Sequence, residues 1–319
     1  MKHSVTALAC IVFTCFATSC VSVERSQSAG AAVTVIDDKS LRQDFEKKMA
    51  ELIKPGGSTS LTTMKEQLER TSTKLELPPT GRKRMSPSAI YQQRIDTTLL
   101  LGKFYRCTNE KCKKIHASIA SGVIIREDGI VLTNYHVVDD KQDRMLGIGV
   151  MTHDGKAFLV DEVLAADKES DVAILRLKGA KELAAAPVFR DEPVGEPVTI
   201  ISNPTGRFFS LSHGCISRYH ISKEGAFIMN VTADYAKGSS GGPIFNDRGD
   251  VVGLVANTVS IPYRHVPLHV DEESKALEIA NKSNKPHIVS GKPLTIGTNH
   301  QMTIKNAVPS RAILDLIVN

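Results

Sequence analysis

The stretch AKGSSGGPIFNDRGDVVG, residues 236–253, places two adjacent serines between glycines and follows them with a proline and an apolar run. Two glycines and Pro243 directly after Ser240 disfavour a helix at that point. The apolar runs on either side of the NDRG turn read instead as two short strands. The stretch therefore predicts a serine-bearing loop in front of β-strands, and it argues against the strand–serine–helix elbow of α/β-hydrolases.

Short runs rich in Val, Ile, Leu and Thr continue this pattern from residue 95 onward, with Gly, Asn, Asp and Pro between them. Examples are GIVLTNYHVV (129–138), DVAILRL (171–177), FIMNVTA (227–233) and DVVGLVAN (250–257). Strands at this close spacing, with few helical segments between them, indicate an all-β sandwich or barrel rather than a parallel α/β sheet.

The first 20 residues have the layout of a secretory signal: Lys2, an apolar stretch over 7–16, and then small residues. The apolar stretch is shorter than the roughly 20 residues that cross a membrane. The end, ATSC, resembles a bacterial lipobox, so that Cys20 becomes a lipidation site; ordinary cleavage nearby, with a freely secreted product, is the alternative. We expect an exported protein of the bacterial periplasm or cell envelope, with residues 21–38 as a flexible tether.

Residues 39–88 are predicted to form a small helical extension and a linker. Apolar residues recur at helical spacing from Leu41 to Leu52, with Ser40 as the predicted cap. Thr63 and Glu66 fit a capping box that opens a second helix. Such short amphipathic helices must bury their apolar stripes, so we expect them to pack on the main domain, residues 89–319.

Two further segments are predicted to be a linker and a helix. The Pro-rich stretch 75–88 reads as the linker, and VPSRAILDLIVN (308–319) reads as a short C-terminal helix that packs on the main domain. The densest basic cluster, GRKR (81–84), lies in the linker without aromatic neighbours. The chain carries a net charge of only +5 over 319 residues. These features argue against a nucleic-acid partner.

Two cysteines are separated by a turn-rich tetrapeptide, Cys107-TNEK-Cys112. In an exported protein this spacing predicts a disulfide across a hairpin. The alternative is a zinc site that adds His116, but it lacks a fourth ligand and the usual two-residue cysteine spacing. We therefore expect no metal and no organic cofactor.

A serine hydroxyl attacks well only when a base takes its proton and a third group orients that base. His136 follows the predicted hairpin around the EDG turn, and Asp171 stands directly before the run VAILRL. The chain therefore offers a histidine, an aspartate and Ser240, in that order.

Four segments together resemble the chymotrypsin-fold, trypsin-like serine peptidases, and most closely the bacterial HtrA/Deg-like branch. They are TNYHVV (133–138), DVAILRL (171–177), SNPTGRFFSLSHGCIS (202–217) and GSSGGPIFNDRGDVVGL (238–254). The resemblance implies two six-stranded β-barrels and a serine endopeptidase that acts on polypeptides. We expect no PDZ domain after the peptidase domain.

The resemblance also implies roles for residues. Ser240 would be the nucleophile, His136 the general base and acid, and Asp171 the group that fixes the histidine tautomer, while the amides of Gly238 and Ser240 would form the oxyanion hole. The chain departs from the family at Ser239, where Asn or Asp is usual.

Two alternatives stay open at this point. Asp234 lies six residues before the nucleophile. In trypsin-like enzymes an acid at that offset binds Lys or Arg side chains, so Asp234 is either a specificity residue or a partner in a turn or ion pair, for example with Lys237. The chain is either an active peptidase or a catalytically silent binding or chaperone-like module on the same fold; it keeps all three triad residues.

Overall fold

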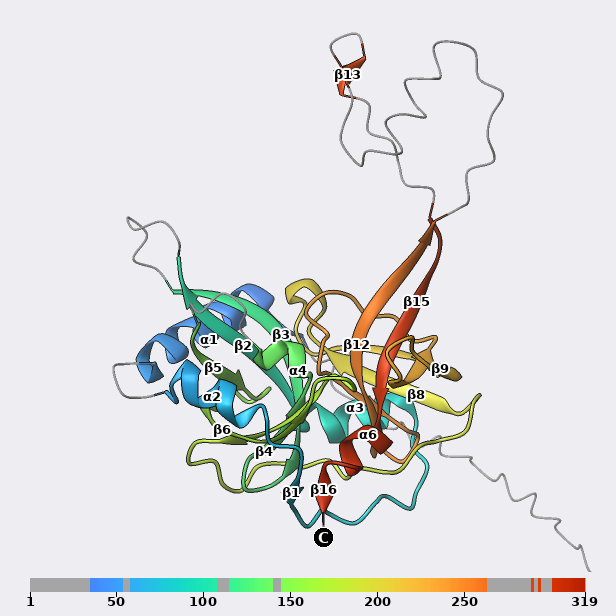
Figure 1. The fold of residues 1–319 in the computed structure, drawn as a ribbon, viewed down its shortest axis with the longest axis horizontal. Coiled ribbons are helices and arrows are strands. Elements are labelled where there is room, and N and C mark those ends of the chain that lie inside the picture. Colours follow the sequence, from blue (N-terminus) through green and yellow to red (C-terminus); the bar gives the residue numbers. More distant parts are fainter. Residues whose placement is uncertain are drawn as a thin grey trace, which may run out of the picture. The chain divides into compact units, whose positions relative to one another are not determined.

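The computed structural model describes residues 35–53, 58–107, 115–139, 145–262, 288–289, 292–293 and 300–318. The chain divides into two units, Met1–Val35 and Ile36–Asn319, and the second contains the elements described below. Its strands form two closed barrels of six strands each, which confirms the predicted architecture (Figure 1).

The first barrel has the strand order β2-β3-β4-β7-β6-β5. Its strands are β2 (Thr98–Arg106), β3 (Ile115–Arg126), β4 (Ile130–Thr133), β5 (Met145–Met151), β6 (Ala157–Asp167) and β7 (Val172–Leu177). The antiparallel pairing of β4 with β7 sets Thr133 opposite Ala173. The segment that leaves β4 therefore lies beside the segment that enters β7, and these two segments carry His136 and Asp171.

The second barrel has the order β10-β15-β12-β11-β8-β9. Its strands are β8 (Pro197–Ser202), β9 (Ser210–Ile221), β10 (Phe227–Val231), β11 (Pro243–Phe245), β12 (Val251–Pro262) and β15 (His300–Pro309). The sequence patterns did not predict β15, which closes this barrel between β10 and β12. Two short paired strands, β13 (Ile288–Val289) and β14 (Lys292–Pro293), precede it in the chain.

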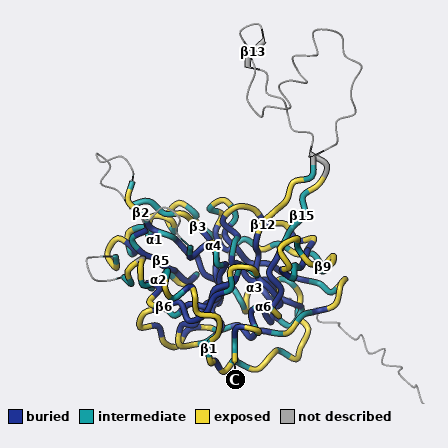
Figure 2. Tube along the Cα trace, viewed as in Figure 1, coloured by how far each residue is buried: buried dark blue, intermediate teal, exposed yellow. Residues whose placement is uncertain are grey.

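The hydrophobic core follows the barrels. One cluster fills the first barrel with residues such as Leu101, Ile124 and Leu175, and another fills the second with residues such as Ile200 and Val255. A third cluster joins residues from both barrels to the helices. Figure 2 shows the barrel strands as mostly buried tube, whereas the far part of β12 is largely exposed and that of β15 is mostly intermediate.

Helices α1 (Asp38–Leu52) and α2 (Leu61–Gln67) pack against the first barrel at β5 and β6. Phe45 of α1 meets Phe104 of β2 edge to face, with 5.2 Å between the ring centroids. The predicted caps were wrong by three residues at each helix. Asp37, not Ser40, caps α1, and Ser60, not Thr63, caps α2; in each case the side chain of the earlier residue accepts the amide hydrogen three residues on.

The remaining helices are short. A third helix, α3 (Pro87–Arg94), starts at the end of the predicted linker and leads into the 3₁₀ turn Ile95–Thr97 and β2. The predicted C-terminal helix is α6 (Ser310–Leu314), and after it β16 (Ile317–Val318) pairs in parallel with β1 (Thr73–Lys74).

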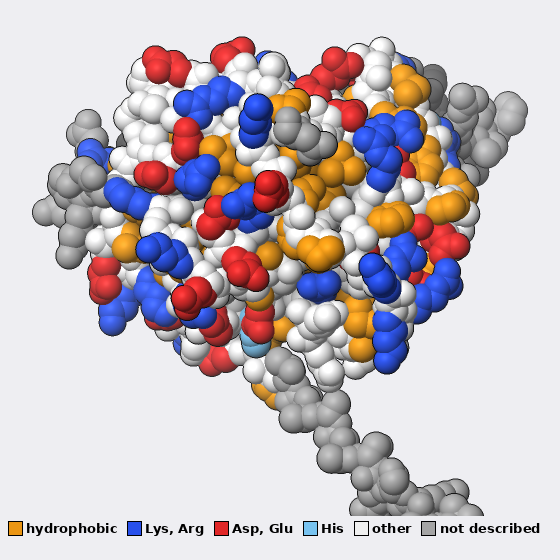
Figure 3. Space-filling model, turned by 90° about the horizontal axis from the view of Figure 1, so that it is seen from below, with side chains coloured by type: hydrophobic (Ala, Val, Ile, Leu, Met, Phe, Trp, Pro, Cys, Tyr) orange, Lys and Arg blue, Asp and Glu red, His pale blue; other side chains and the backbone are white. Residues whose placement is uncertain are grey.

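None of the helices among the described residues has the length and apolar character needed to span a membrane. On the face drawn in Figure 3, basic and acidic side chains are interspersed rather than separated by sign.

Candidate active site

The structure brings His136 and Asp171 into direct contact. The Asp171 carboxylate lies 2.8 Å (Oδ2) and 3.0 Å (Oδ1) from the imidazole Nδ1 of His136. Oδ1 also accepts the backbone N–H of His136 at 3.0 Å. A carboxylate at Nδ1 fixes the tautomer with the proton on Nδ1, which leaves Nε2 free to accept a proton.

The backbone on both sides of this pair is specialised. His136 lies in the one-turn helix α4 (Tyr135–Val138), directly after β4. Asp171 has a φ of +58°, a left-handed conformation in the turn before β7 that aspartate tolerates better than most residues. The buried Asn134 donates from Nδ2 to the carbonyl of Asp171 at 2.9 Å, which ties the two loops together.

The two adjacent serines have different surroundings. Ser239 is 0% exposed, and its Oγ accepts a hydrogen bond from Ser202 at 3.0 Å. Ser240 lines a cavity of about 400 Å³ together with His136. Its hydroxyl donates to the carbonyl of Ala256 at 3.2 Å. Only Ser240 is therefore placed where a substrate and the histidine can both reach the hydroxyl.

The loop before the nucleophile has an unusual backbone conformation. Gly238 has a φ of +98° and Gly241 a φ of +79°, both in the region that favours glycine. A Cβ on Gly238 would lie 2.5 Å from the carbonyl oxygen of Asn203. Within the described residues, the amides of Gly238 and Ser240 donate to no carbonyl of the chain. They are available as the two donors of an oxyanion hole.

A buried polar network holds this loop against the first barrel. Ser121 of β3 donates from Oγ to the carbonyl of Gly238 at 2.9 Å, and its backbone N–H donates to the carbonyl of Ser240 at 2.8 Å. Asn203 donates from Nδ2 to Ser121 Oγ at 2.9 Å and to the Leu99 carbonyl at 3.0 Å. Ser121 and Asn203 are completely buried. The peptide units on either side of the nucleophile are thus positioned from the other barrel.

The sequence patterns did not predict this network. Asn203 lies in the segment SNPTGRFFSLSHGCIS (202–217), but no role was predicted for its side chain, nor for those of Ser121 and Asn134. Small polar residues inside otherwise apolar strand ends, as in IASGVII around Ser121, are the sequence signal that points to such a network.

The wall of the cavity comes from the segments on either side of Ser240. Besides His136 and Ser240, the lining residues are Tyr235, Ala236, Lys237, Ala256, Asn257 and Thr258. The Tyr235 hydroxyl lies 2.5 Å from the carbonyl oxygen of Asn306, its nearer acceptor, and 3.2 Å from that of Asn257. Burial raises the pKa of this phenol well above its usual range. No carboxylate is among the lining residues that the structure describes.

Asp234 is placed outside this lining. Its side chain is 91% exposed and forms an ion pair with Lys305 of β15, with 3.3 Å between Oδ1 and Nζ. The same ammonium group donates to the backbone carbonyl of Tyr235 at 2.9 Å. The geometry favours the ion-pair alternative for Asp234, with Lys305 rather than Lys237 as the partner.

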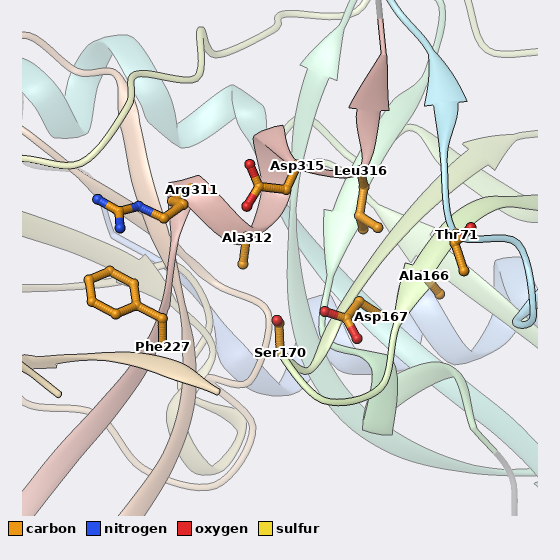
Figure 4. A pocket seen from close by; sticks show the side chains of 9 residues that line it. All are labelled: Thr71, Ala166, Asp167, Ser170, Phe227, Arg311, Ala312, Asp315 and Leu316. Carbon is orange, nitrogen blue, oxygen red and sulfur yellow. The ribbon is translucent and has the colours of Figure 1, made fainter. Parts of the chain in front are cut away.

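A second cavity, of about 330 Å³, is lined by residues that include Asp167 and Ser170, at the turn between β6 and β7 (Figure 4). Its polar lining includes Asp167, Ser170 and Asp315, and its apolar lining includes Phe227 and Leu316. No histidine is among its described lining residues, so it does not show the serine–histidine combination found at the first cavity.

Three predicted sites lie wholly or partly outside the described residues. Cys20, the candidate lipidation site, and Cys112, the expected disulfide partner, are among the undescribed residues. Cys107 ends the segment that contains β2, and His116 of β3 stacks on Tyr105 with 5.9 Å between the rings. The disulfide and its zinc alternative therefore both stay predictions.

Comparisons with known proteins agree with this geometry. Residues 120–254 match the family model of the trypsin-like peptidase domain. A probable periplasmic serine endoprotease DegP-like from Ectopseudomonas mendocina (strain ymp) is 34% identical over 142 residues, which cover 43% of this chain and 29% of that protein. Serine protease HTRA1 from Xenopus laevis is 29% identical over 158 residues, covering 47% of this chain and 33% of that protein. The chain thus spans a third or less of the length of these relatives.

The fold comparison extends beyond the matched segment. The structure of the HtrA-type protease AlgW with decapeptide aligns with a TM-score of 0.51, over 72% of this chain and 66% of that chain, at 18% identity. At 18% identity, this similarity supports the fold and not the activity. Residues 120–254 therefore match a trypsin-like peptidase domain and are similar in sequence to the HtrA and DegP serine proteases, and they lie within the two six-stranded barrels of this chain.

Proposed function

We propose that this chain is a serine endopeptidase that cleaves polypeptides through Ser240, His136 and Asp171. The observation that carries the proposal is the 2.8 Å contact between Asp171 Oδ2 and His136 Nδ1, at a cavity that Ser240 also lines. That contact fixes the histidine tautomer with the proton on Nδ1, so that Nε2 can act as the base for Ser240.

In the proposed reaction, His136 Nε2 takes the hydroxyl proton while Ser240 Oγ attacks the carbonyl carbon of the scissile bond. The negative charge on the substrate oxygen is stabilised by the amides of Gly238 and Ser240, each worth about 3 kcal/mol in such sites. The protonated histidine then gives its proton to the leaving amine. Water, activated by the same histidine, hydrolyses the acyl-enzyme and regenerates Ser240.

The nucleophile must turn before it attacks. Its hydroxyl proton points to the Ala256 carbonyl, with 3.2 Å between the oxygens. A rotation of the hydroxyl releases the proton toward the histidine, and a substrate N–H that binds the Ala256 carbonyl favours that rotation. Hydrogen bonds of this kind commonly tighten only when substrate is bound.

The proposed setting is the bacterial cell envelope, in protein processing or quality control. Support comes from the signal-like residues 1–20 and from DegP-like relatives whose names describe them as periplasmic. Lipid anchoring through Cys20 and a Cys107–Cys112 disulfide are part of this proposal. A catalytically silent, chaperone-like module is the alternative.

Digestion of an unfolded protein tests the proposal directly. Wild-type protein is expected to cleave reduced casein, whereas Ser240→Ala and His136→Ala each leave casein intact. Ser239→Ala is the matched control and is expected to retain measurable cleavage. Casein that stays intact with the folded wild-type protein would support the silent module instead.

A further inference from the structure

The far ends of β12 and β15 form a two-stranded arm, residues 259–262 and 300–304, that continues beyond the second barrel (Figure 1). Strand β11 pairs with β12 only as far as Leu254, and β10 pairs with β15 only from Lys305 onward. In the arm, the two strands therefore pair only with each other among the strands that the structure describes. The outer edge of β12 in the arm is therefore open among the described strands.

The arm has one apolar face and one polar face. Val259 pairs with Ile304, and Ile261 pairs with Met302, so these four side chains share a face of the ribbon. Ser260, paired with Thr303, lies on the opposite face. Val259 is 46% exposed and Met302 is 53% exposed. None of the four apolar residues belongs to the core clusters formed by the described residues.

The open edge of β12 begins at the nucleophile. The carbonyl of Ala256 faces Ser240, whereas the next carbonyl, that of Asn257, faces the Tyr235 hydroxyl. The pairing of β12 with β15 shifts register between Val255 and Asn257 and is regular from Asn257 to Ile261. In that regular stretch the carbonyls alternate in direction, so those of Thr258 and Ser260 point the opposite way from the Asn257 carbonyl. Thr258 also lines the active-site cavity. A single strand edge thus runs from the reacting serine out along the arm.

With a polypeptide substrate added to this edge as an antiparallel strand, we infer that the apolar face of the arm selects two of the substrate's side chains. This inference rests on the proposed peptidase function. With the residue that carries the scissile carbonyl opposite Ala256, each residue toward the substrate's N-terminus lies opposite the next residue of β12. The fourth and sixth residues then lie opposite Val259 and Ile261, on the apolar face.

The occupant is a substrate rather than another protein surface because the edge is continuous with the cavity. Anything that pairs along Thr258 and Ser260 also reaches Ala256 and the mouth of the cavity at Ser240. An extended chain satisfies the unpaired amides and carbonyls of the edge as an added strand. Apolar side chains at every second position, four and six, cover the side chains of Val259, which is exposed, and Ile261, which is half-buried.

A matched pair of internally quenched peptides tests the inference. Both carry six residues before the scissile bond, with the residue at that bond taken from the casein cleavage sites. Counting from the bond toward the N-terminus, the first peptide has Leu at positions four and six and Ser at three and five. The second peptide exchanges the Leu and Ser residues, so the compositions are identical. We expect kcat/KM to be about tenfold higher for the first peptide.

Arm variants locate the source of this preference. Val259→Thr combined with Ile261→Thr makes polar the two β12 positions that lie opposite substrate residues four and six, and it is expected to reduce the tenfold preference to about twofold. Ser260→Thr, on the opposite face of the same strand, is the control and is expected to keep the preference. The rate at which a fluorophosphonate labels Ser240 should be equal in all of these proteins.

The outcomes separate the two proposals. Equal kcat/KM for the two peptides in the wild-type protein, or a preference that survives in the double variant, would overturn the role of the arm. A change of oligomeric state in the double variant, with the peptide preference unaltered, would overturn it in favour of a contact between copies. Absence of fluorophosphonate labelling in the wild-type protein would instead refute the peptidase function itself.

Discussion

Ser121 in the first barrel donates its hydroxyl hydrogen to the carbonyl of Gly238 in the second, over 2.9 Å and without exposure to solvent. The same residue holds the carbonyl of Ser240 through its amide at 2.8 Å. The orientation of the proposed oxyanion donors therefore depends on a residue about 120 positions away in the chain. Catalysis should respond to this contact even though Ser121 is not part of the triad.

Ser121→Ala removes the buried donor and leaves the Gly238 carbonyl unpaired, which typically costs 1–3 kcal/mol. We expect kcat to fall by roughly 10- to 100-fold with a smaller change in KM, because the oxyanion hole acts mainly in the transition state. Ser118→Ala, at an exposed position of the same strand, is the control. Unchanged kcat in Ser121→Ala with an unaltered thermal midpoint would contradict the positioning role.

Gly238→Ala tests the loop conformation itself. The added Cβ meets the Asn203 carbonyl oxygen at 2.5 Å, at a φ of +98°. We expect a loss of at least about 100-fold in kcat/KM for casein-derived peptides, because the oxyanion hole deforms. Gly195→Ala is the matched control: its φ is +94°, but an added Cβ meets nothing within 4 Å. A similar loss in both variants would show that backbone strain, not the loop geometry at the nucleophile, is responsible.

Asp234→Ala should leave the preference at the cleavage site unchanged. Its carboxylate is 91% exposed and pairs with Lys305, and it is not among the residues that line the cavity. The measurement is a cleavage profile of a peptide library, compared between the wild type and the variant. Selective loss of cleavage after Lys and Arg in the variant would instead identify Asp234 as the specificity residue.

Asp250 should make stability depend on pH. This carboxyl group is buried, and desolvation raises its pKa although Gly81 N–H, Arg94 and Arg248 favour its charged form. The folded protein therefore binds the proton more tightly than the unfolded chain does, so the contribution of Asp250 to the unfolding free energy rises as the pH falls through its folded pKa.

Urea unfolding of the wild type and Asp250→Asn checks this sign. The wild type is expected to gain unfolding free energy relative to the variant between pH 7 and about pH 4, near the pKa of an unfolded aspartate. Comparing the two proteins cancels the titration of groups that they share. A constant difference, or one that moves in the variant's favour on acidification, would contradict the prediction.

Much of the fold was accessible from the sequence because its signals are local. Period-two apolar runs and turn residues mark most barrel strands, and the segments around His136, Asp171 and Ser240 are each short and continuous. The closing strand β15 was not predicted because residues 263–299, which are polar and weakly patterned, separate it from β12. Its own run, HQMTIKNAVP, carries a lysine and an asparagine among the apolar residues.

Two kinds of feature could not be predicted from the sequence: the choice between neighbouring caps and the contacts between distant segments. Asp37 and Ser40 are both good caps three residues apart, and only the structure determines which one accepts the amide hydrogen. The Ser121–Asn203 network joins two barrels, and no periodicity within either strand indicates its partner. The ion pair of Asp234 with Lys305 was hidden for the same reason, because β15 itself was not predicted.

Active-site labelling shows whether Ser240, and not its neighbour Ser239, is the acylated nucleophile. The protein is treated with a fluorophosphonate, digested, and the modified residue is located by mass spectrometry. We predict a single adduct on Ser240, abolished in Ser240→Ala, strongly slowed in His136→Ala and present in Ser239→Ala. An adduct on Ser239, or a folded wild-type protein that does not react at all, would contradict the assignment of Ser240 as the nucleophile.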